Sequence, residues 1–350
     1  MKFSTVLCAA VILSLPMTQF AKADDIVGVR QILAPSKERG VDLDVTVWYP
    51  AQAGGEQVLL GDNRFFIGTH ARSDAPIVEG RHPLIVLSHG AGGHAPAMGW
   101  IAAPLAQQGF IVAAPNHPGS TSEDESAADT FKFWLRPADL TATLNTLEKE
   151  AFLEKHLDMD RVGALGFSAG GYTALAVAGV LMNPQLLAAY CDTTQRNPYM
   201  CRWAKRSGVD LHTMDLQPAG RDNSDKRIRS VVAIDPGLTD IMTPRSVANV
   251  SIPVDLINLG RSDEIMPTLQ ASEIAKTIKD ARYTTVDDAV HESFLAECKT
   301  DAIEGLKREK LPPLCDDGGG RSRNEIHAQL IDMITGAFSR TLKPSDGDLQ

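Results

Sequence analysis

The chain has 350 residues, of which 43% are hydrophobic and 22% charged, which is the composition of an ordinary globular protein and excludes a disordered or fibrous one. Acidic residues outnumber basic ones by 44 to 34, and the formal net charge of −10 argues against nucleic acid or an anionic membrane surface as a partner. The length fits one large α/β domain with insertions as well as it fits two domains.

The first 23 residues are typical of a secretory signal peptide. Lys2 precedes an apolar run over residues 6–15, Pro16 breaks the run, and Ala21-Lys22-Ala23 supplies a small-x-small cleavage site. The apolar run is too short to span a bilayer as a stable anchor. We therefore expect cleavage after Ala23, removal of Cys8, and a mature chain of residues 24–350 in the periplasm or outside the cell.

The mature chain keeps four cysteines. In an exported protein they predict two disulfides, and four cysteines allow three pairings. The simplest pairing joins Cys191 to Cys201 and Cys298 to Cys315, because each pair falls within one polar, loop-like stretch. Free buried thiols are the alternative.

The mature chain begins with strand patterns and continues with a strand–helix–strand unit. Alternating apolar residues before Pro50 predict an antiparallel hairpin, and a following segment rich in Gly, Asp and Arg predicts a surface excursion. In chain order we expect strands over 25–33 and 41–49, the excursion over 51–81, a strand over 82–88, a helix over 96–108 and a strand over 110–114. The last three segments form a right-handed parallel crossover.

The rest of the chain alternates strands and helices, apart from one insertion. We expect a helix over 136–153, a strand over 161–165, strands over 228–234 and 252–259, a helix over 269–278, a strand over 282–286 and a helix over 325–338. Residues 183–227 carry two cysteines and many charges without a clear strand, and are interpreted as a cap beside the site. The pattern predicts a doubly wound, mostly parallel α/β sheet with its site at the carboxyl ends of the strands.

Ser168 lies in the segment Gly166-Phe167-Ser168-Ala169-Gly170, between a short apolar strand and an alanine-rich helix. Small residues two positions away on each side are what a sharp strand-to-helix turn requires, because the two backbones approach closely there. A bare G-x-S-x-G also occurs by chance, but here the strand before it and the helix after it are both present. The sequence therefore predicts that Ser168 is a nucleophile.

A serine nucleophile needs a histidine base and an acid that orients the base, in the chain order serine, acid, histidine. His291, in the loop after the last predicted strand, is the candidate base. Two acids follow strands at the expected end of the sheet, Asp235 in VVAIDPG and Asp263 in GRSDEIMP. Spacing does not separate them, and we favour Asp263 because its turn, between Gly260 and Pro267, is the usual setting of this acid.

The anion formed during acyl transfer needs backbone donors that are fixed in advance. We expect the N–H groups of Ala169, after the nucleophile, and of Ala91, in the loop after the 82–88 strand, to form this oxyanion hole. His89 is expected to be a structural residue of the same loop. No HExxH and no paired Cys/His spacing is present, so the sequence predicts no metal site.

Several motifs together resemble one branch of a known superfamily. They are WYP (48–50), PLIVLSHGAGG (83–93), GFIVAAPNHPGST (109–121), RPADL (136–140) and GFSAGG (166–171), together with the loops of Asp263 and His291. The set is similar to the predicted dienelactone-hydrolase branch of the α/β-hydrolases and, more distantly, to platelet-activating-factor acetylhydrolases and cutinase-like polyesterases. True dienelactone hydrolases use a cysteine where this chain has Ser168. In the acetylhydrolases the acid follows the earlier strand, which keeps Asp235 as an alternative.

The resemblance implies hydrolysis of carboxylic esters by a serine nucleophile, without a cofactor. The expected activity is that of an exported serine hydrolase that cleaves a small-molecule ester through an acyl-enzyme. Two alternatives remain. One is an amidase or peptidase with the same residues, and the other is a non-catalytic binding protein of the same fold.

Overall fold

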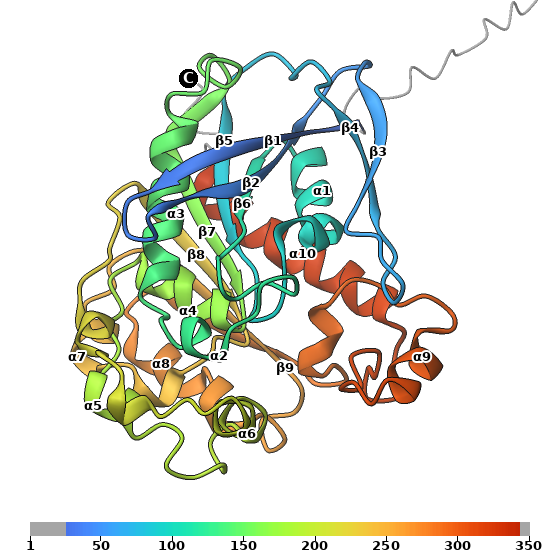
Figure 1. Cartoon of the computed structure of the whole chain (residues 1–350). Helices are drawn as coiled ribbons and strands as arrows, with labels where there is room; N and C mark the ends of the chain where they lie inside the picture. The colour runs from blue at the N-terminus through green and yellow to red at the C-terminus, as the bar shows by residue number, and fades with distance from the viewer. Residues whose placement is uncertain (1–25, 344–350) are drawn as a thin grey trace, which may run out of the picture.

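The computed structural model of the chain describes residues 26–343, so the predicted signal peptide and Cys8 lie outside the described residues. A single ten-stranded sheet forms the centre, in the order β10-β9-β8-β7-β5-β6-β2-β1-β4-β3 (Figure 1). The strands are β1 (Val27–Ser36), β2 (Val41–Pro50), β3 (Glu56–Leu60), β4 (Thr69–Ser73), β5 (His82–Ser88), β6 (Ile111–Pro115), β7 (Leu157–Phe167), β8 (Ile228–Ile234), β9 (Val254–Leu259) and β10 (Ala281–Val286).

The helices connect these strands. The α-helices are α1 (Gly99–Gln107), α2 (Ala127–Thr130), α3 (Leu135–Leu147), α4 (Ala169–Ala176), α5 (Pro184–Ala188), α6 (Pro198–Arg206), α7 (Pro244–Ala248), α8 (Ser272–Thr277), α9 (Ala302–Arg308) and α10 (Arg323–Leu342). Six neighbouring strands, from β10 to β6, run parallel, and β2 and β1 add an antiparallel hairpin. The predicted doubly wound sheet, the hairpin and the parallel crossover are therefore confirmed.

Successive residues of the central strands point to opposite faces of the sheet, as the period of two requires. In β5, Leu84 and Val86 belong to the core cluster that contains α3 and α4, whereas Ile85 and Leu87 belong to the cluster that contains α1 and α10. Helices thus cover both faces (Figure 1). Because both faces are buried, these strands are continuous apolar runs, which is why the sequence locates them well.

The surface excursion expected over residues 51–81 contains two strands that the sequence did not predict. β4 pairs with β1, and β3 pairs with β4, so the segment widens the sheet at one edge. Within these two strands only Ala71 is buried. Strands with so little burial have no clear alternation of apolar and polar residues, and the pattern therefore gave no signal.

Residues 183–227 form short helices without any strand, as expected for an insertion. They lie at the same end of the sheet as α4 and α2 (Figure 1). Tyr190 and Thr268 share a hydrogen bond of 2.6 Å between their hydroxyls, which joins this insertion to the loop after β9.

Two disulfides are present, and they are the predicted ones. Cys191 is bonded to Cys201 within the insertion, and Cys298 is bonded to Cys315 around α9. Two disulfides are typical of a protein in an oxidising compartment.

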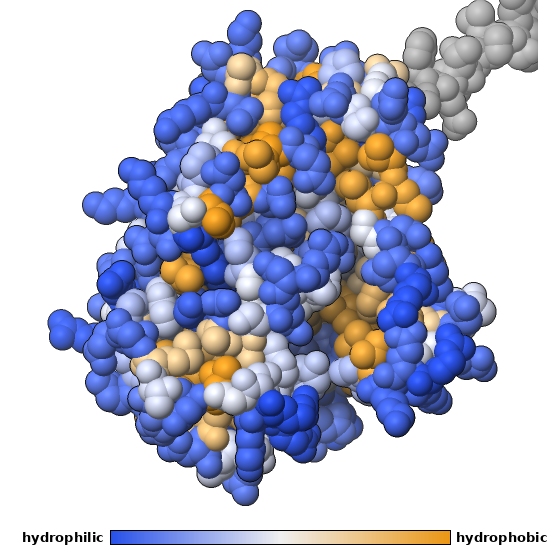
Figure 2. Space-filling view, in the orientation of Figure 1, coloured by the Kyte–Doolittle hydropathy of each residue, from blue (hydrophilic) through white to orange (hydrophobic). Residues whose placement is uncertain are grey.

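The face in Figure 2 is mostly polar, with apolar side chains in separate groups. Across residues 26–343, no helix combines the length and the apolar character needed to cross a bilayer.

Candidate active site

Ser168 occupies the sharp turn between β7 and α4. Its backbone has φ 56° and ψ −119°, a region that a residue with a Cβ rarely adopts and that is typical of a nucleophile held at such a turn. A Cβ on Gly166 would lie 1.9 Å from the carbonyl oxygen of Gly170, and one on Gly170 would lie 1.9 Å from that of Ser88. The small residues of the motif are therefore required by backbone contact, as the sequence predicted.

His291 lies beside Ser168. It begins the short helix η7 (His291–Phe294) after β10, and its Nε2 is 3.1 Å from the Ser168 hydroxyl oxygen. The imidazole also packs against the ring of Phe167, with 4.6 Å between centroids. The side chain is 25% exposed, so a substrate and water can reach it. The structure brings together the serine and the histidine that the sequence singled out.

The acid beside His291 is Asp235, and the favoured Asp263 does not contact His291. Asp235 is 1% exposed, and its Oδ2 accepts a hydrogen bond of 2.8 Å from His291 Nδ1. Asp263 is 75% exposed and lies 3.5 Å from Arg261 Nε, on the surface. The order of the strands gives the reason. Asp235 follows β8, which is the neighbour of the nucleophile strand β7, whereas Asp263 follows β9, one strand further away.

Asn258 fixes the carboxylate of Asp235, and it is not among the residues that the sequence singled out. Its Nδ2 donates to Asp235 Oδ1 at 2.7 Å, and the N–H of Leu259 donates to the same oxygen at 2.8 Å. The Asn258 side chain also bonds the backbone of Leu269 and Ala271. The available signal was a polar residue inside the apolar run VDLINL of β9, because a fully buried amide needs partners.

The carboxylate of Asp235 sets the protonation of His291. Burial lowers the pKa of His291, but the hydrogen bond to Asp235 and its negative charge raise it more, and the net pKa lies above the usual value. Because a carboxylate can only accept, Nδ1 carries the hydrogen and Nε2 of the neutral ring accepts from the Ser168 hydroxyl. This is the tautomer that a histidine needs to take a proton from serine.

The two predicted oxyanion donors lie next to this serine in the chain or in space. Ala169 is the first residue of α4, where backbone N–H groups have no acceptor within the helix. Ala91 is exposed and follows Gly90. A Cβ on Gly90 would lie 3.4 Å from the Cβ of Ser168, so the loop after β5 packs against the turn. Their role as oxyanion donors remains a prediction.

Metal ligands are not grouped near the site. Among residues 26–343, no three His, Cys, Asp or Glu side chains are placed so that they could hold a metal ion together.

Known proteins resemble this chain at the level of fold. A ferulic acid esterase from Streptomyces cinnamoneus aligns over 95% of this chain and 94% of its own, with 20% sequence identity and a TM-score of 0.63. The protein has the α/β-hydrolase fold. This fold was the one implied by the sequence motifs.

Other likenesses are weaker. A model of the prolyl oligopeptidase family matches residues 96–215 of this α/β-hydrolase-fold protein. A puromycin-hydrolyzing peptidase of Mycobacterium tuberculosis aligns over 90% of this chain and 40% of its own, at 12% identity and a TM-score of 0.50. A dienelactone hydrolase from Anabaena variabilis aligns over 90% of this chain and 98% of its own, at 14% identity and a TM-score of 0.49. No curated protein sequence matches the chain.

Proposed function

We propose that this protein is an exported serine hydrolase that cleaves carboxylic esters, with Ser168 as nucleophile, His291 as general base and Asp235 as the acid that orients it. The observation that carries the proposal is the unbroken chain of hydrogen bonds from Ser168 through His291 to Asp235. A serine hydroxyl is a weak nucleophile until an oriented base removes its proton.

The reaction proceeds in two halves. The Ser168 oxygen attacks the ester carbonyl carbon while His291 Nε2 takes the hydroxyl proton, and the tetrahedral anion then collapses as His291 returns that proton to the leaving alcohol. The acyl group stays on Ser168. Water then attacks this acyl-enzyme with His291 as base, which releases the acid and restores the serine. The carboxylate of Asp235 orients His291 and stabilises the imidazolium.

The N–H groups of Ala169 and Ala91 bind the oxyanion in this mechanism. Donors that already point to the position of the developing charge stabilise the transition state more than the ground state, and therefore raise kcat. No cofactor and no metal ion take part.

Esters are preferred over peptides as the substrate class because the ferulic acid esterase matches the chain over nearly its whole length, whereas the chain spans less than half of the puromycin-hydrolyzing peptidase. The match to the prolyl oligopeptidase family supports peptide hydrolysis as the second candidate. The insertion over residues 183–227 lies at the end of the sheet that carries Ser168, and we assign it the selection of substrate size.

The test is hydrolysis of p-nitrophenyl esters from acetate to palmitate, compared with aminoacyl p-nitroanilides, by the purified chain and by Ser168→Ala. Ester turnover that disappears in Ser168→Ala supports the proposal, and the chain-length profile measures the pocket. Turnover of anilides alone supports the peptidase. No turnover of either series would leave a binding protein of the same fold.

Export is proposed from the two disulfides and from the leader pattern at the amino terminus. The mass of the chain secreted by an expressing cell tests it, since cleavage after Ala23 leaves Asp24 as the first residue. A chain that retains Met1 and stays in the cytoplasm would contradict export.

A further inference from the structure

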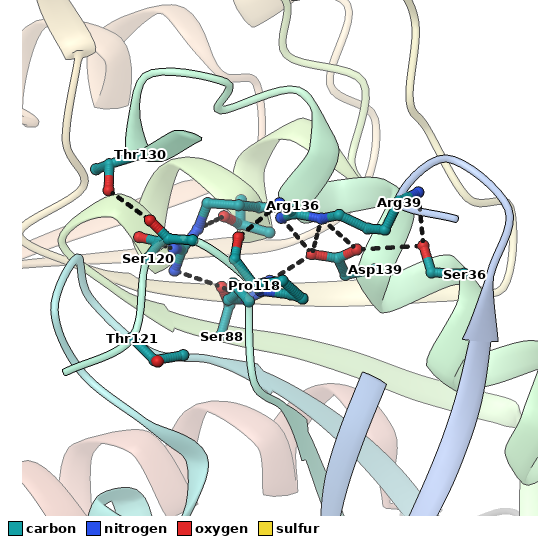
Figure 3. Close-up of polar contacts among 12 residues, drawn as sticks. Ser36, Arg39, Ser88, Pro118, Ser120, Thr121, Thr130, Arg136 and Asp139 are labelled. Carbon is teal, nitrogen blue, oxygen red and sulfur yellow. Dashed lines mark hydrogen bonds and ion pairs between the residues drawn. The ribbon is translucent and has the colours of Figure 1, made fainter. Parts of the chain in front are cut away.

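A buried polar network surrounds Arg136 and Asp139 (Figure 3), and it reaches the backbone of His89, two residues before Ala91. Its centre is Arg136 on α3, which is 2% exposed. The guanidinium donates to Thr173 Oγ1 on α4 at 3.2 Å, to Ser120 Oγ at 3.0 Å, and to the carbonyl oxygen of His89. One side chain therefore joins the helix that follows Ser168, the loop after β6, and residues 89–93, which contain Ala91 and are called the oxyanion loop.

A second arm of the network reaches the end of β5. Ser88 Oγ lies 2.8 Å from His117 Nε2, and His117 Nδ1 lies 2.8 Å from Asp139 Oδ2. Arg39 holds the same carboxylate through two of its nitrogens (Figure 3). Because the carboxylate only accepts, His117 Nδ1 carries the hydrogen, and the Ser88 hydroxyl donates to Nε2. The donor and the acceptor of each hydrogen bond in this arm are therefore defined.

The ring of His89 connects the network to the oxyanion loop by two hydrogen bonds. Its Nε2 accepts the backbone N–H of His117 at 3.2 Å, so the hydrogen is on Nδ1, which donates to the carbonyl oxygen of Gly90 at 2.7 Å. The N–H of Gly93 donates to the same oxygen at 3.2 Å. In a trans peptide the carbonyl and the following N–H point in opposite directions. Fixing the oxygen of Gly90 therefore fixes the direction of the Ala91 N–H.

We propose that Arg136, His117 and His89 are positioning residues for the oxyanion hole, and that the buried network fixes the Ala91 N–H before substrate binds. The inference rests on the proposed function. The side chains of His89, His117 and Arg136 are buried, and their hydrogen bonds go to residues other than Ser168 and His291. Their contribution is to prevent the reorientation of the donor that would otherwise accompany the reaction.

The charge states of the network are consistent with a rigid support. Burial lowers the pKa of both His89 and His117 well below the usual value, and the positive charge of Arg136 lowers both pKa values further. Both rings are neutral at pH 7, and their donors and acceptors keep one arrangement. Burial also lowers the pKa of Arg136, to about 9, which still leaves the guanidinium charged at that pH.

The test compares Ser88→Ala and Arg136→Lys with Thr143→Val. Thr143 is the matched control, because it is a buried hydroxyl on the same helix as Arg136 and donates only to the backbone carbonyl of Asp139. The readouts are kcat and KM for the best p-nitrophenyl ester, the affinity for an alkyl boronic acid that forms a tetrahedral adduct with Ser168, and the melting temperature.

We expect kcat to fall about 10- to 100-fold in Ser88→Ala and Arg136→Lys, with KM within about threefold. A misplaced N–H donor stabilises the transition state less, whereas binding of the substrate in the ground state is little changed. Boronic acid affinity falls with kcat. Thr143→Val keeps kcat, KM and boronic acid affinity within about twofold of the unmodified protein. A purely structural role would lower the melting temperature in every variant and leave kcat and boronic acid affinity of the folded protein unchanged.

A lower melting temperature with unchanged kcat and boronic acid affinity would overturn the inference. Should Arg136→Lys not fold, Ser88→Ala decides, since it removes one oxygen atom only. If the unmodified protein hydrolyses no ester in a Ser168-dependent manner, the proposed function fails, and the support role fails with it. If the unmodified protein is active and Ser88→Ala equals Thr143→Val in kcat, only the support role fails.

Discussion

Within residues 26–343, two chains of hydrogen bonds have the same order of serine, histidine and aspartate, and they differ in whether the histidine is exposed to solvent. Ser168, His291 and Asp235 follow β7, β10 and β8, whereas Ser88 ends β5, His117 follows β6 and Asp139 lies on α3. The distances are similar, since each histidine is 2.8 Å from its carboxylate and 3.1 or 2.8 Å from its serine. The environments differ. His291 is 25% exposed, whereas the side chains of His117 and Asp139 are 0% exposed.

The difference in environment reverses the effect on the histidine. The pKa of His291 is raised because Asp235 outweighs burial, whereas the pKa of His117 is lowered because burial is complete and because Arg136 and Arg39 are close. A histidine whose protonated form is strongly disfavoured is a poor general base, and a serine that is fully buried cannot reach a substrate. Hydrogen-bond geometry alone therefore does not distinguish the two serines, and the proposed role of Ser168 rests also on solvent access and on the charges around its histidine.

The largest expected effect separates the two serines. Ser168→Ala lowers kcat by about 10⁴-fold or more, because no other group supplies the nucleophile. Ser88→Ala keeps at least about 1% of the activity, because it changes only the support of the oxyanion loop. Steady-state hydrolysis of the best p-nitrophenyl ester measures both. Equal losses in the two variants would remove the distinction between the two chains.

The two candidate acids give the next effect. Asp235→Asn lowers kcat by about 10³- to 10⁴-fold, because the amide no longer holds His291 in the required tautomer. Asp263→Asn is the control and stays within about twofold, because the carboxylate lies on the surface beside Arg261. Loss of turnover in Asp263→Asn with normal turnover in Asp235→Asn would return the acid to the position that the sequence favoured.

Asp139→Asn tests the hydrogen bonds among Ser88, His117 and Asp139 through the free energy of unfolding. This change leaves the buried guanidinium of Arg39 without its carboxylate, so the free energy of unfolding falls by about 3–5 kcal/mol, the usual cost of breaking a buried ion pair. Urea unfolding measures it, and kcat falls far less than in Asp235→Asn. An unfolding free energy within about 1 kcal/mol of the unmodified protein would show that the network does not hold this part of the fold.

The pH dependence gives the smallest effect. Below its pKa, His291 is protonated and cannot act as base, so kcat/KM rises with pH, and the midpoint lies above the ordinary histidine value of about 6.5. In Asp235→Asn burial remains and the negative charge is lost, so the midpoint moves to lower pH. His117→Asn leaves the midpoint unchanged, since His117 is not the base. A midpoint that follows His117 instead of Asp235 would contradict the assignment.

The sequence locates what depends on local pattern. The predicted strands over 82–88 and 228–234 coincide with β5 and β8, because an apolar run with clear ends defines a buried strand. Ser168 and His291 were found because one lies in a motif and the other follows the last strand. Asp235 was kept as the alternative to Asp263, because the choice between the two depends on which strand neighbours β7.

The buried network depends on contacts between distant parts of the chain. Arg136 and Asp139 are both in the motif RPADL, three residues apart on α3, but their partners include Arg39, 100 residues before Asp139, and Ser88, 48 residues before Arg136. Nothing in the local pattern shows that these residues meet. Only the packing of α3 against the sheet brings them together.

The most direct test of the account is mass spectrometry of the purified chain after reaction with an alkyl fluorophosphonate, which reacts with an activated serine. The account predicts one adduct per chain, on the peptide that contains Ser168, and no adduct on the peptide that contains Ser88. Protonation of His291 at low pH suppresses the labelling. An unlabelled chain, or an adduct on a serine other than Ser168, would contradict the claim that Ser168 is the nucleophile.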